Sequence, residues 1–350
     1  MKIGTGINYA SDFHEAVDRI VDLEAAGADQ VWVSEAYSVD AVSRVGYLAA
    51  ATKTMEIGTG ILNVYSRTAA AIAQTAAGCD MVSKGRFILG LGASGPQVVE
   101  GFHGVRYEKP VRRIREYIDI TRMALRREKL VYDGGTVQLP LPEGEGTGLG
   151  KPLKLINHPV RSEIPIWWAS LMPLAVRDTA RMADGWIPTA FLPEHLQTVW
   201  GEPLAKGMAD RPAELGTLDI SKSAMVAIGD DLVGEAADRI LDGARPGTAL
   251  YWGGMGARDK NFYNSIARQQ GYDAEAGRIQ DLYLDGHKTE AEAEVPRDFL
   301  ERGNLVGPES VVKERLALWK ESGITAINVS LPGGNAVETM ATLRSLVEDV

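Results

Sequence analysis

The sequence predicts an α/β barrel of eight parallel strands, and three observations lead to this prediction. Short apolar segments alternate with amphipathic helical segments through most of the 350 residues, which is typical of βα units and a parallel sheet. This alternation yields eight strand candidates, and eight strands with eight helices are the number that closes a barrel. Nothing divides the strands into the two halves of a doubly wound sheet.

The first four βα units are expected within about ninety residues. Residues 2–9 are apolar and punctuated by glycine, which indicates a buried strand. A helix follows, because Asp12 and Glu15 are spaced as a capping box and Gly27 is a natural stop. The next strands and helices are expected at residues 30–36, 41–53, 56–62, 68–83 and 86–91.

Four further strands are expected to start near Ile166, Trp186, Ile220 and Ala326. Two segments interrupt the alternation. Residues 130–163 are rich in glycine and proline and contain two β-like runs, so we expect a hairpin or an irregular excursion. Residues 243–307 lack any clear strand and contain charged helical stretches. We therefore predict a single domain, residues 1–350, that carries both segments as insertions.

Composition excludes several classes of protein. The net charge of −10 argues against a dedicated nucleic-acid binder. The single cysteine, Cys79, lies in a helical pattern and is expected to be a buried thiol. No apolar run is long enough to span a membrane and no signal peptide is visible, so we expect a cytoplasmic protein. The five histidines are scattered without metal-ligand spacing, and no metal site is expected.

Residues 90–95, Gly-Leu-Gly-Ala-Ser-Gly, have the G-x-G-x-x-G spelling of a dinucleotide-binding loop. Such a loop belongs in the first βαβ unit and runs directly into a helix. Here it follows the fourth strand, and Pro96, Gly101 and Gly104 are expected to delay a long helix. The dinucleotide interpretation is therefore rejected. Either the glycines let a barrel strand turn, or they let the backbone approach a ligand ring.

The carboxyl ends of the strands are where a barrel of this type places its chemistry. In this sequence they hold small residues and few charges, for example 60–63, 92–95 and 168–170. Such a mouth suits a flat organic cofactor better than a metal ion.

Several segments resemble the bacterial-luciferase-like barrel superfamily, and in particular its coenzyme F420-dependent oxidoreductases. They include "VWVSEAYSVDA", "EIGTGILNVYSRTAAAIAQTA" and "GRFILGLGASGPQVVEGFHG". The likeness continues through "IPIWWASLMPLAVRDTARMADGWIPT" and "LVGPESVVKERLALWKESGITAINV", and it is weakest over residues 243–302.

The resemblance implies that a deazaflavin, or FMN in other branches, binds at the mouth of the barrel, and that the deazaflavin transfers a hydride. It also implies a bulge in the third strand with a non-proline cis peptide, here matched by Gly60-Ile61. The acidic tail of the deazaflavin needs positive partners, for which Arg67, Arg177, Arg258 and Lys260 are candidates. The implied cofactor-binding residues are Glu35, Gly60, Ile61, Asn63, Gly92, Ala93, Ser94, Ala169, Ser170, Leu171, Gly185, Trp186 and Thr189.

The sequence also departs from the family pattern. Some relatives carry Asp-His after the second strand, where this chain has Glu35-Ala36, and some carry a glutamate near Gly95. These departures favour reduction of an activated double bond over alcohol oxidation. Glu35 and Tyr37 are the catalytic candidates, although Glu35 could equally serve a structural role. The alternatives are an FMN-dependent luciferase-like monooxygenase and a non-catalytic deazaflavin or flavin carrier. A homodimer or higher homo-oligomer is expected from the resemblance.

Overall fold

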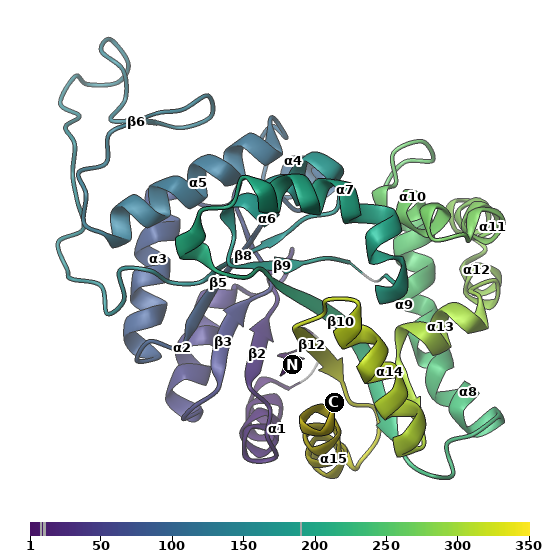
Figure 1. Cartoon of the computed structure of the whole chain (residues 1–350). Helices are drawn as coiled ribbons and strands as arrows, with labels where there is room; N and C mark the ends of the chain where they lie inside the picture. Colours follow the sequence, from purple (N-terminus) through teal and green to yellow (C-terminus); the bar gives the residue numbers. More distant parts are fainter. Residues whose placement is uncertain (8, 10–11, 190) are drawn as a thin grey trace.

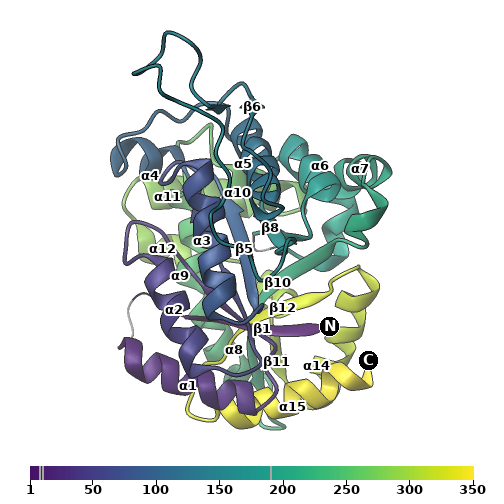
Figure 2. The same cartoon turned by 90° about the vertical axis from the view of Figure 1, so that its left-hand side faces the viewer.

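The computed structural model describes residues 1–7, 9, 12–189 and 191–350, and within them eight parallel strands close a barrel. The strands are β1 (Lys2–Ile7), β2 (Gln30–Val33), β3 (Glu56–Thr59), β5 (Phe87–Gly92), β8 (Ile166–Ala169), β9 (Gly185–Ile187), β10 (Asp219–Ile228) and β12 (Ala326–Ser330). The last strand pairs with the first, so the two ends of the chain lie near each other (Figures 1 and 2). The predicted fold class is confirmed.

Helices surround the barrel on the outside (Figure 1). They are α1 (Phe13–Ala25), α2 (Ala41–Ala51), α3 (Ala69–Val82), α4 (Pro96–Gly101), α5 (Pro110–Leu125), α6 (Pro173–Met182), α7 (Leu196–Ala209), α14 (Glu309–Glu321) and α15 (Ala336–Asp349). The expected cap of the first helix is present, because the Asp12 carboxylate accepts hydrogen bonds from the backbone N–H groups of His14 and Glu15. This bond satisfies donors that the helix itself leaves free.

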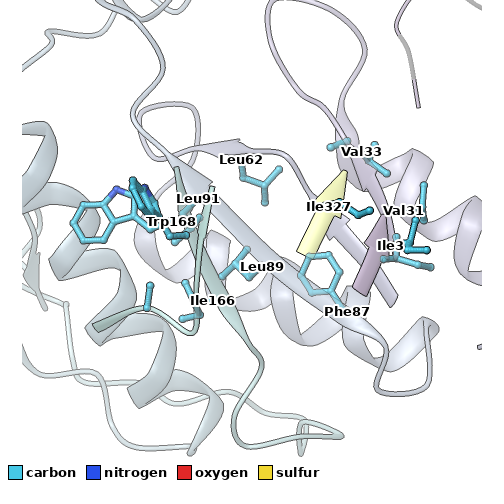
Figure 3. Packing of buried hydrophobic residues seen from close by; sticks show 14 of the residues in the cluster. Ile3, Val31, Val33, Leu62, Phe87, Leu89, Leu91, Ile166, Trp168 and Ile327 are labelled. Carbon is cyan, nitrogen blue, oxygen red and sulfur yellow. The ribbon is translucent and has the colours of Figure 1, made fainter. Parts of the chain in front are cut away.

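The two faces of each strand pack differently. Outward-facing side chains such as Phe87, Leu89 and Leu91 form the main core between the strands and the helices (Figure 3). The inward face carries Trp32 and Trp167, whose rings lie 5.0 Å apart.

Glycines leave room for these two tryptophans inside the barrel. A Cβ at Gly58 would lie 2.5 Å from the Trp32 ring, and a Cβ at Gly185 would lie 2.2 Å from the Trp167 ring. Trp168 packs in the outer core instead, so the two adjacent tryptophans face opposite ways, as neighbouring residues of a strand do. Because the interior is filled by packed side chains, a ligand must bind above it, at the strand ends.

A bulge interrupts the pairing of the third and fourth barrel strands. The offset between partners is 30 residues at Ile57–Phe87 but 29 residues at Leu62–Leu91, in the short strand β4 (Leu62–Asn63) that continues β3. The third barrel strand therefore carries one residue more than its partner, β5, which defines a β-bulge at residues 59–61. The peptide bond between Gly60 and Ile61 is cis, as the resemblance implied.

The first insertion contains an antiparallel hairpin of β6 (Tyr132–Asp133) and β7 (Gln138–Leu139). It extends away from the barrel (Figure 1). The buried carboxylate of Glu116 on α5 accepts hydrogen bonds from the backbone N–H groups of Gly135, Thr136 and Val137. These bonds fasten the hairpin to the helix and hold the pKa of Glu116 below its ordinary value, although burial opposes them.

The second insertion is mainly helical and packs on one side of the barrel (Figure 1). Its helices and those next to it are α8 (Glu235–Leu241), α9 (Arg245–Ala249), a π-helical turn (Leu250–Gly254), α10 (Phe262–Gln269), α11 (Asp273–Leu284), α12 (Lys288–Ala293) and α13 (Arg297–Gly303). They enclose a hydrophobic cluster of their own around Trp252, Ile279 and Phe299.

The expectation that this insertion lacks a strand is wrong, because β11 (Leu305–Gly307) pairs in parallel with β10. A three-residue strand that ends in glycine leaves almost no periodicity to detect. It forms because β10 is ten residues long and offers a pairing edge beyond the barrel.

Lys222 ties β10 to the second insertion through a buried ammonium group. Its Nζ donates to the carbonyl of Gly303 at 2.8 Å and lies 5.1 Å from the centre of the Trp319 ring. Burial lowers the pKa of Lys222 from 10.5 to about 7. Between these two values the unfolded chain binds more protons than the folded chain, so this group makes stability rise with pH in that range.

Replacing the lysine tests this assignment. In Lys222→Met, the increase in unfolding free energy between pH 7 and pH 9.5, measured with urea, should be smaller than in the unchanged protein. The same increase in both proteins would show that Lys222 is charged in the folded state throughout this range.

A second prediction concerns the bulge. A Cβ at Gly90 would lie 1.7 Å from the carbonyl oxygen of Thr59, so Gly90→Ala must displace backbone. We expect a loss of about 1–3 kcal/mol in unfolding free energy. Gly78→Ala in α3 is the matched control, because its Cβ would meet nothing within 4 Å. Equal stability of the two variants would contradict the close contact between β3 and β5.

Candidate active site

The rim of the barrel mouth at β5 is built from backbone with little side chain. The hydroxyl of Thr59 donates to the Gly90 carbonyl at 3.0 Å and accepts from the Gly90 N–H at 2.9 Å. These two hydrogen bonds connect β3 and β5 at the bulge, where the regular backbone hydrogen bonds between the two strands are interrupted. A Cβ at Gly92 would lie 2.9 Å from the Ile61 side chain, so this position leaves space for the bulge as well. The glycines of the G-x-G-x-x-G segment are therefore explained first by the neighbouring strand.

The chain turns sharply after this rim. Ser94 has a φ of 58°, which is uncommon for a residue with a side chain. Its carbonyl accepts a hydrogen bond from the Tyr107 hydroxyl at 3.4 Å. The expectation that no helix follows immediately is wrong, because the short helix α4 begins at Pro96, directly after Gly95. Proline suits the first helical position, since its missing N–H would have no helical partner there.

Glu35, one of the two catalytic candidates, is held by three hydrogen bonds. Its carboxylate accepts from the Arg67 guanidinium, with one N–O distance of 3.0 Å, and from the Ala41 N–H at 2.8 Å. Only 10% of the side chain is exposed. The hydrogen bond that Arg67 donates to Glu35 raises the pKa of Arg67 above its ordinary value, although burial opposes the rise. Of the two roles left open for Glu35, these contacts support the structural one.

Tyr37, the other catalytic candidate, is 68% exposed, and its ring centre lies 6.3 Å from that of Phe102. It therefore lies at the open edge of the mouth and is not paired with Glu35.

The residues expected after β8 and β9 divide into two groups. Ala169 lies at the mouth, since its Cβ would be 3.6 Å from a Cβ at Gly92. Thr189 also lies there and lines a hollow beside the second insertion. Gly185 instead lies beneath the Trp167 ring, inside the barrel.

Three of the expected residues lie behind the mouth and stabilise it through buried contacts, namely Ser170, Leu171 and Trp186. The Trp186 indole is fully buried against Phe191 and Trp200, and it donates to the Ser170 carbonyl at 2.9 Å. The Trp200 indole donates to the Leu171 carbonyl at 2.8 Å. The Trp186 side chain thus lies in the outer core, away from the barrel interior.

Asn63 carries an unpartnered donor beside the bulge. Its Oδ1 accepts from the Tyr65 N–H at 2.9 Å. Its Nδ2 is buried, and no hydrogen-bond partner for it exists among the residues that the structure describes. Asn63 pairs in register with Gly92, on the inward face of the sheet. A buried donor without a partner is unfavourable, which marks this amide as a candidate to bind a ligand oxygen.

Four tyrosines also lie around the mouth, and sequence reasoning missed three of them, Tyr107, Tyr251 and Tyr263. Tyr65 and Tyr107 stack with ring centres 5.4 Å apart, and Tyr251 and Tyr263 lie 4.7 Å apart. Burial raises the pKa of Tyr65 and of Tyr263 to about 12, so both phenols stay protonated at neutral pH. Tyr65 follows the end of β4 by two residues, whereas Tyr107 lies in a loop and Tyr251 and Tyr263 lie in the second insertion. The apolar run around Tyr251 was the one signal available in the sequence.

The described residues hold no group of potential metal ligands and no helix that could cross a membrane. Among residues 1–7, 9, 12–189 and 191–350, no three His, Cys, Asp or Glu side chains are grouped so that they could hold a metal ion. No helix in these ranges is long and apolar enough to cross a membrane.

Three of the four candidate cations for the tail have carboxylate partners, namely Arg67 with Glu35, Arg177 with Asp178 and Arg258 with Asp281.

The structural role of Glu35 can be tested with a double-mutant cycle. Glu35→Ala and Arg67→Ala should each destabilise the protein, and the pair should show a coupling of about 0.5–3 kcal/mol in unfolding free energy. Additive losses would show that the ion pair contributes nothing beyond the separate residues.

The chain was compared with known proteins. The model of the luciferase-like monooxygenase family matches residues 1–326. A protein of Mycobacterium tuberculosis named "Putative coenzyme F420-dependent oxidoreductase" is 37% identical over 349 residues, which covers 98% of this chain and 99% of that protein. A 5,10-methylenetetrahydromethanopterin reductase of Archaeoglobus fulgidus is 27% identical over 65% of this chain and 64% of its own length.

Two solved structures share the fold over 99% of this chain and 98% of their own. The coenzyme F420-dependent tetrahydromethanopterin reductase of Methanopyrus kandleri superposes with a TM-score of 0.79 at 18% identity. An F420-dependent secondary alcohol dehydrogenase superposes with a TM-score of 0.72 at 16% identity. These two structures share the fold, while the family model and the M. tuberculosis relative show that the chain belongs to the luciferase-like monooxygenase family and to a group with a member named a putative coenzyme F420-dependent oxidoreductase.

Proposed function

We propose that this protein is an F420-dependent oxidoreductase that moves a hydride between the deazaflavin and a small organic substrate. The observation that carries the proposal is the backbone rim at Gly92, Ala93 and Ser94, which faces the bulge at Gly60 and Ile61. A flat ring needs a surface that side chains do not obstruct, and this part of the mouth has one. The name of the M. tuberculosis relative, a putative coenzyme F420-dependent oxidoreductase, supports the same cofactor.

The residues at the mouth fit a deazaflavin. A Cβ at Gly92 would lie 2.9 Å from the Ile61 side chain, so a residue larger than glycine would displace Ile61 and change the shape of the rim. The unpartnered Asn63 amide is a donor for a ring carbonyl. When bound, the deazaflavin would supply the hydride chemistry, while the chain would orient it and exclude water.

The direction of the reaction follows from which acid and base groups are present. Ala36 and Gly95 stand where some relatives carry a histidine and a glutamate, so two bases suited to alcohol oxidation are missing. Protonated phenols lie around the mouth instead, among them those of Tyr65 and Tyr263. Reduction of an activated double bond requires a proton as well as a hydride, and a phenol can donate it. The proposal includes pairing of two barrels in a homodimer or higher homo-oligomer.

Cofactor choice is tested by titration. The protein should bind F420 at micromolar or lower concentrations, as followed by quenching of F420 fluorescence, and should bind FMN at least tenfold more weakly. Tight binding of FMN with no binding of F420 would favour the FMN-dependent monooxygenase instead. Binding of F420 without turnover of enones, imines and alcohols would indicate a carrier.

The place of the ring is tested with Gly60→Val. A Cβ at this position would already touch Trp32 at 3.7 Å, so the branched side chain would occupy space at the bulge. We expect at least a tenfold weaker affinity for F420, with a melting temperature close to that of the unchanged protein. Gly150→Val, in the first insertion, is the matched control and should bind F420 normally. Unchanged affinity in Gly60→Val would remove the bulge from the site.

A further inference from the structure

We propose that the hollow between the end of β9 and the second insertion is the substrate pocket, and that it takes a neutral, largely apolar molecule about the size of one ring. This inference rests on the proposed function, because it names the substrate class for the same site. The hollow has a volume of about 200 Å³. Its lining residues are Thr189, Ala244, Gly247, Thr248, Tyr251, Trp252 and Tyr263.

The hollow lies beside the backbone rim. Thr189 follows β9 by two residues, at the carboxyl end of the barrel. Burial raises the pKa of Tyr263, and the nearby phenols of Tyr251 and Tyr107 add to the rise. The Tyr107 hydroxyl in turn bonds the carbonyl of Ser94, in the rim itself. A molecule in the hollow would therefore lie on the same, carboxyl-terminal side of the barrel as a ring placed against the rim.

The lining residues select for a neutral substrate. None of the seven residues that line the hollow is charged, within the part of the chain that the structure describes. An anion such as a sugar phosphate would lose its hydration there without gaining a cation. The hydroxyl groups of Thr189 and the two tyrosines can bind one carbonyl or similar acceptor, whereas the Thr248 hydroxyl already donates to the Ala244 carbonyl at 2.9 Å. The aromatic faces of Tyr251 and Trp252 suit a flat apolar body.

The wall of the hollow is fixed by packing. The π-helical turn that carries Tyr251 and Trp252 presses on α11, since a Cβ at Gly253 or Gly254 would lie 2.4 Å from Tyr283. The carbonyl of Trp252 accepts hydrogen bonds from Asn261 at 3.0 Å and from Asn264 at 2.8 Å. Turns of this kind occur frequently at functional sites. The hollow therefore has a defined shape that can discriminate by size.

Gly247 sets the size of the hollow. It lies within the helix α9, and a Cβ there would meet nothing within 4 Å. The packing of neighbouring atoms therefore does not require glycine at this position. What glycine leaves here is open space, on the side of the hollow that it lines. Because Gly247 is one of the residues that line the hollow, we expect a larger side chain there to reduce the hollow without disturbing the wall.

The test compares Gly247→Leu with Gly78→Leu, a control in α3 whose Cβ also meets nothing within 4 Å. Binding of 2-cyclohexen-1-one to the cofactor-free protein is followed by ligand-observed NMR, and 1-cyclohexene-1-carboxylate serves as the charged analogue of similar size. We expect Gly247→Leu to weaken cyclohexenone binding at least tenfold and to leave the F420 affinity within twofold. The carboxylate should bind the unchanged protein at least tenfold more weakly than the enone.

The outcomes separate this inference from the proposed function. Cyclohexenone binding that is absent from the unchanged protein, or unaffected by Gly247→Leu, would overturn the pocket even if F420 binds. Loss of both ligands in Gly247→Leu would also overturn it as a separate substrate site. Sensitivity of cyclohexenone binding to Gly247→Leu in a protein that does not bind F420 would keep the pocket and overturn the cofactor.

Discussion

The site depends on the close contact between the bulge of the third barrel strand and the glycines of the fourth. The Thr59 carbonyl occupies the position where a side chain at Gly90 would begin, and Ile61 lies where one at Gly92 would extend. At this contact, residues 59–61 leave the regular hydrogen-bond ladder between the two strands. The rim of the mouth beside them consists mainly of backbone atoms. Gly90 and Gly92 thus serve both the packing of the barrel and the shape of its mouth. Either function alone would restrict which residues could replace them.

The filled interior of the barrel places the ligand above it. Trp32 and Trp167 occupy the inside, against Gly58 and Gly185, so chemistry is confined to the strand ends. The second insertion then builds one wall of the mouth, with its own hydrophobic cluster as support. The barrel provides the surface for the proposed ring, and the insertion provides the pocket for the proposed substrate.

Much of the fold could be predicted because strands buried on both faces alternate visibly with amphipathic helices. The three residues of β11 were missed, since so short a strand has no period of its own. The site was harder to predict. The pairing of Glu35 with Arg67 joins residues 32 positions apart, and no local pattern reveals it. Tyr107, Tyr251 and Tyr263 reach the mouth from separate loops and helices, so only the folded chain brings them together. By contrast, the bulge at Gly60 and Ile61 was identified from the resemblance alone.

The central claim is that a deazaflavin ring lies against the bulge and the backbone rim. A crystal structure of the protein with F420 tests it most directly. The account predicts that the ring contacts Gly60, Ile61 and residues 92–94, with a ring oxygen within hydrogen-bond distance of the Asn63 amide. A ring placed on the outer face of the barrel, or inside the hollow lined by Gly247 and Trp252, would contradict it.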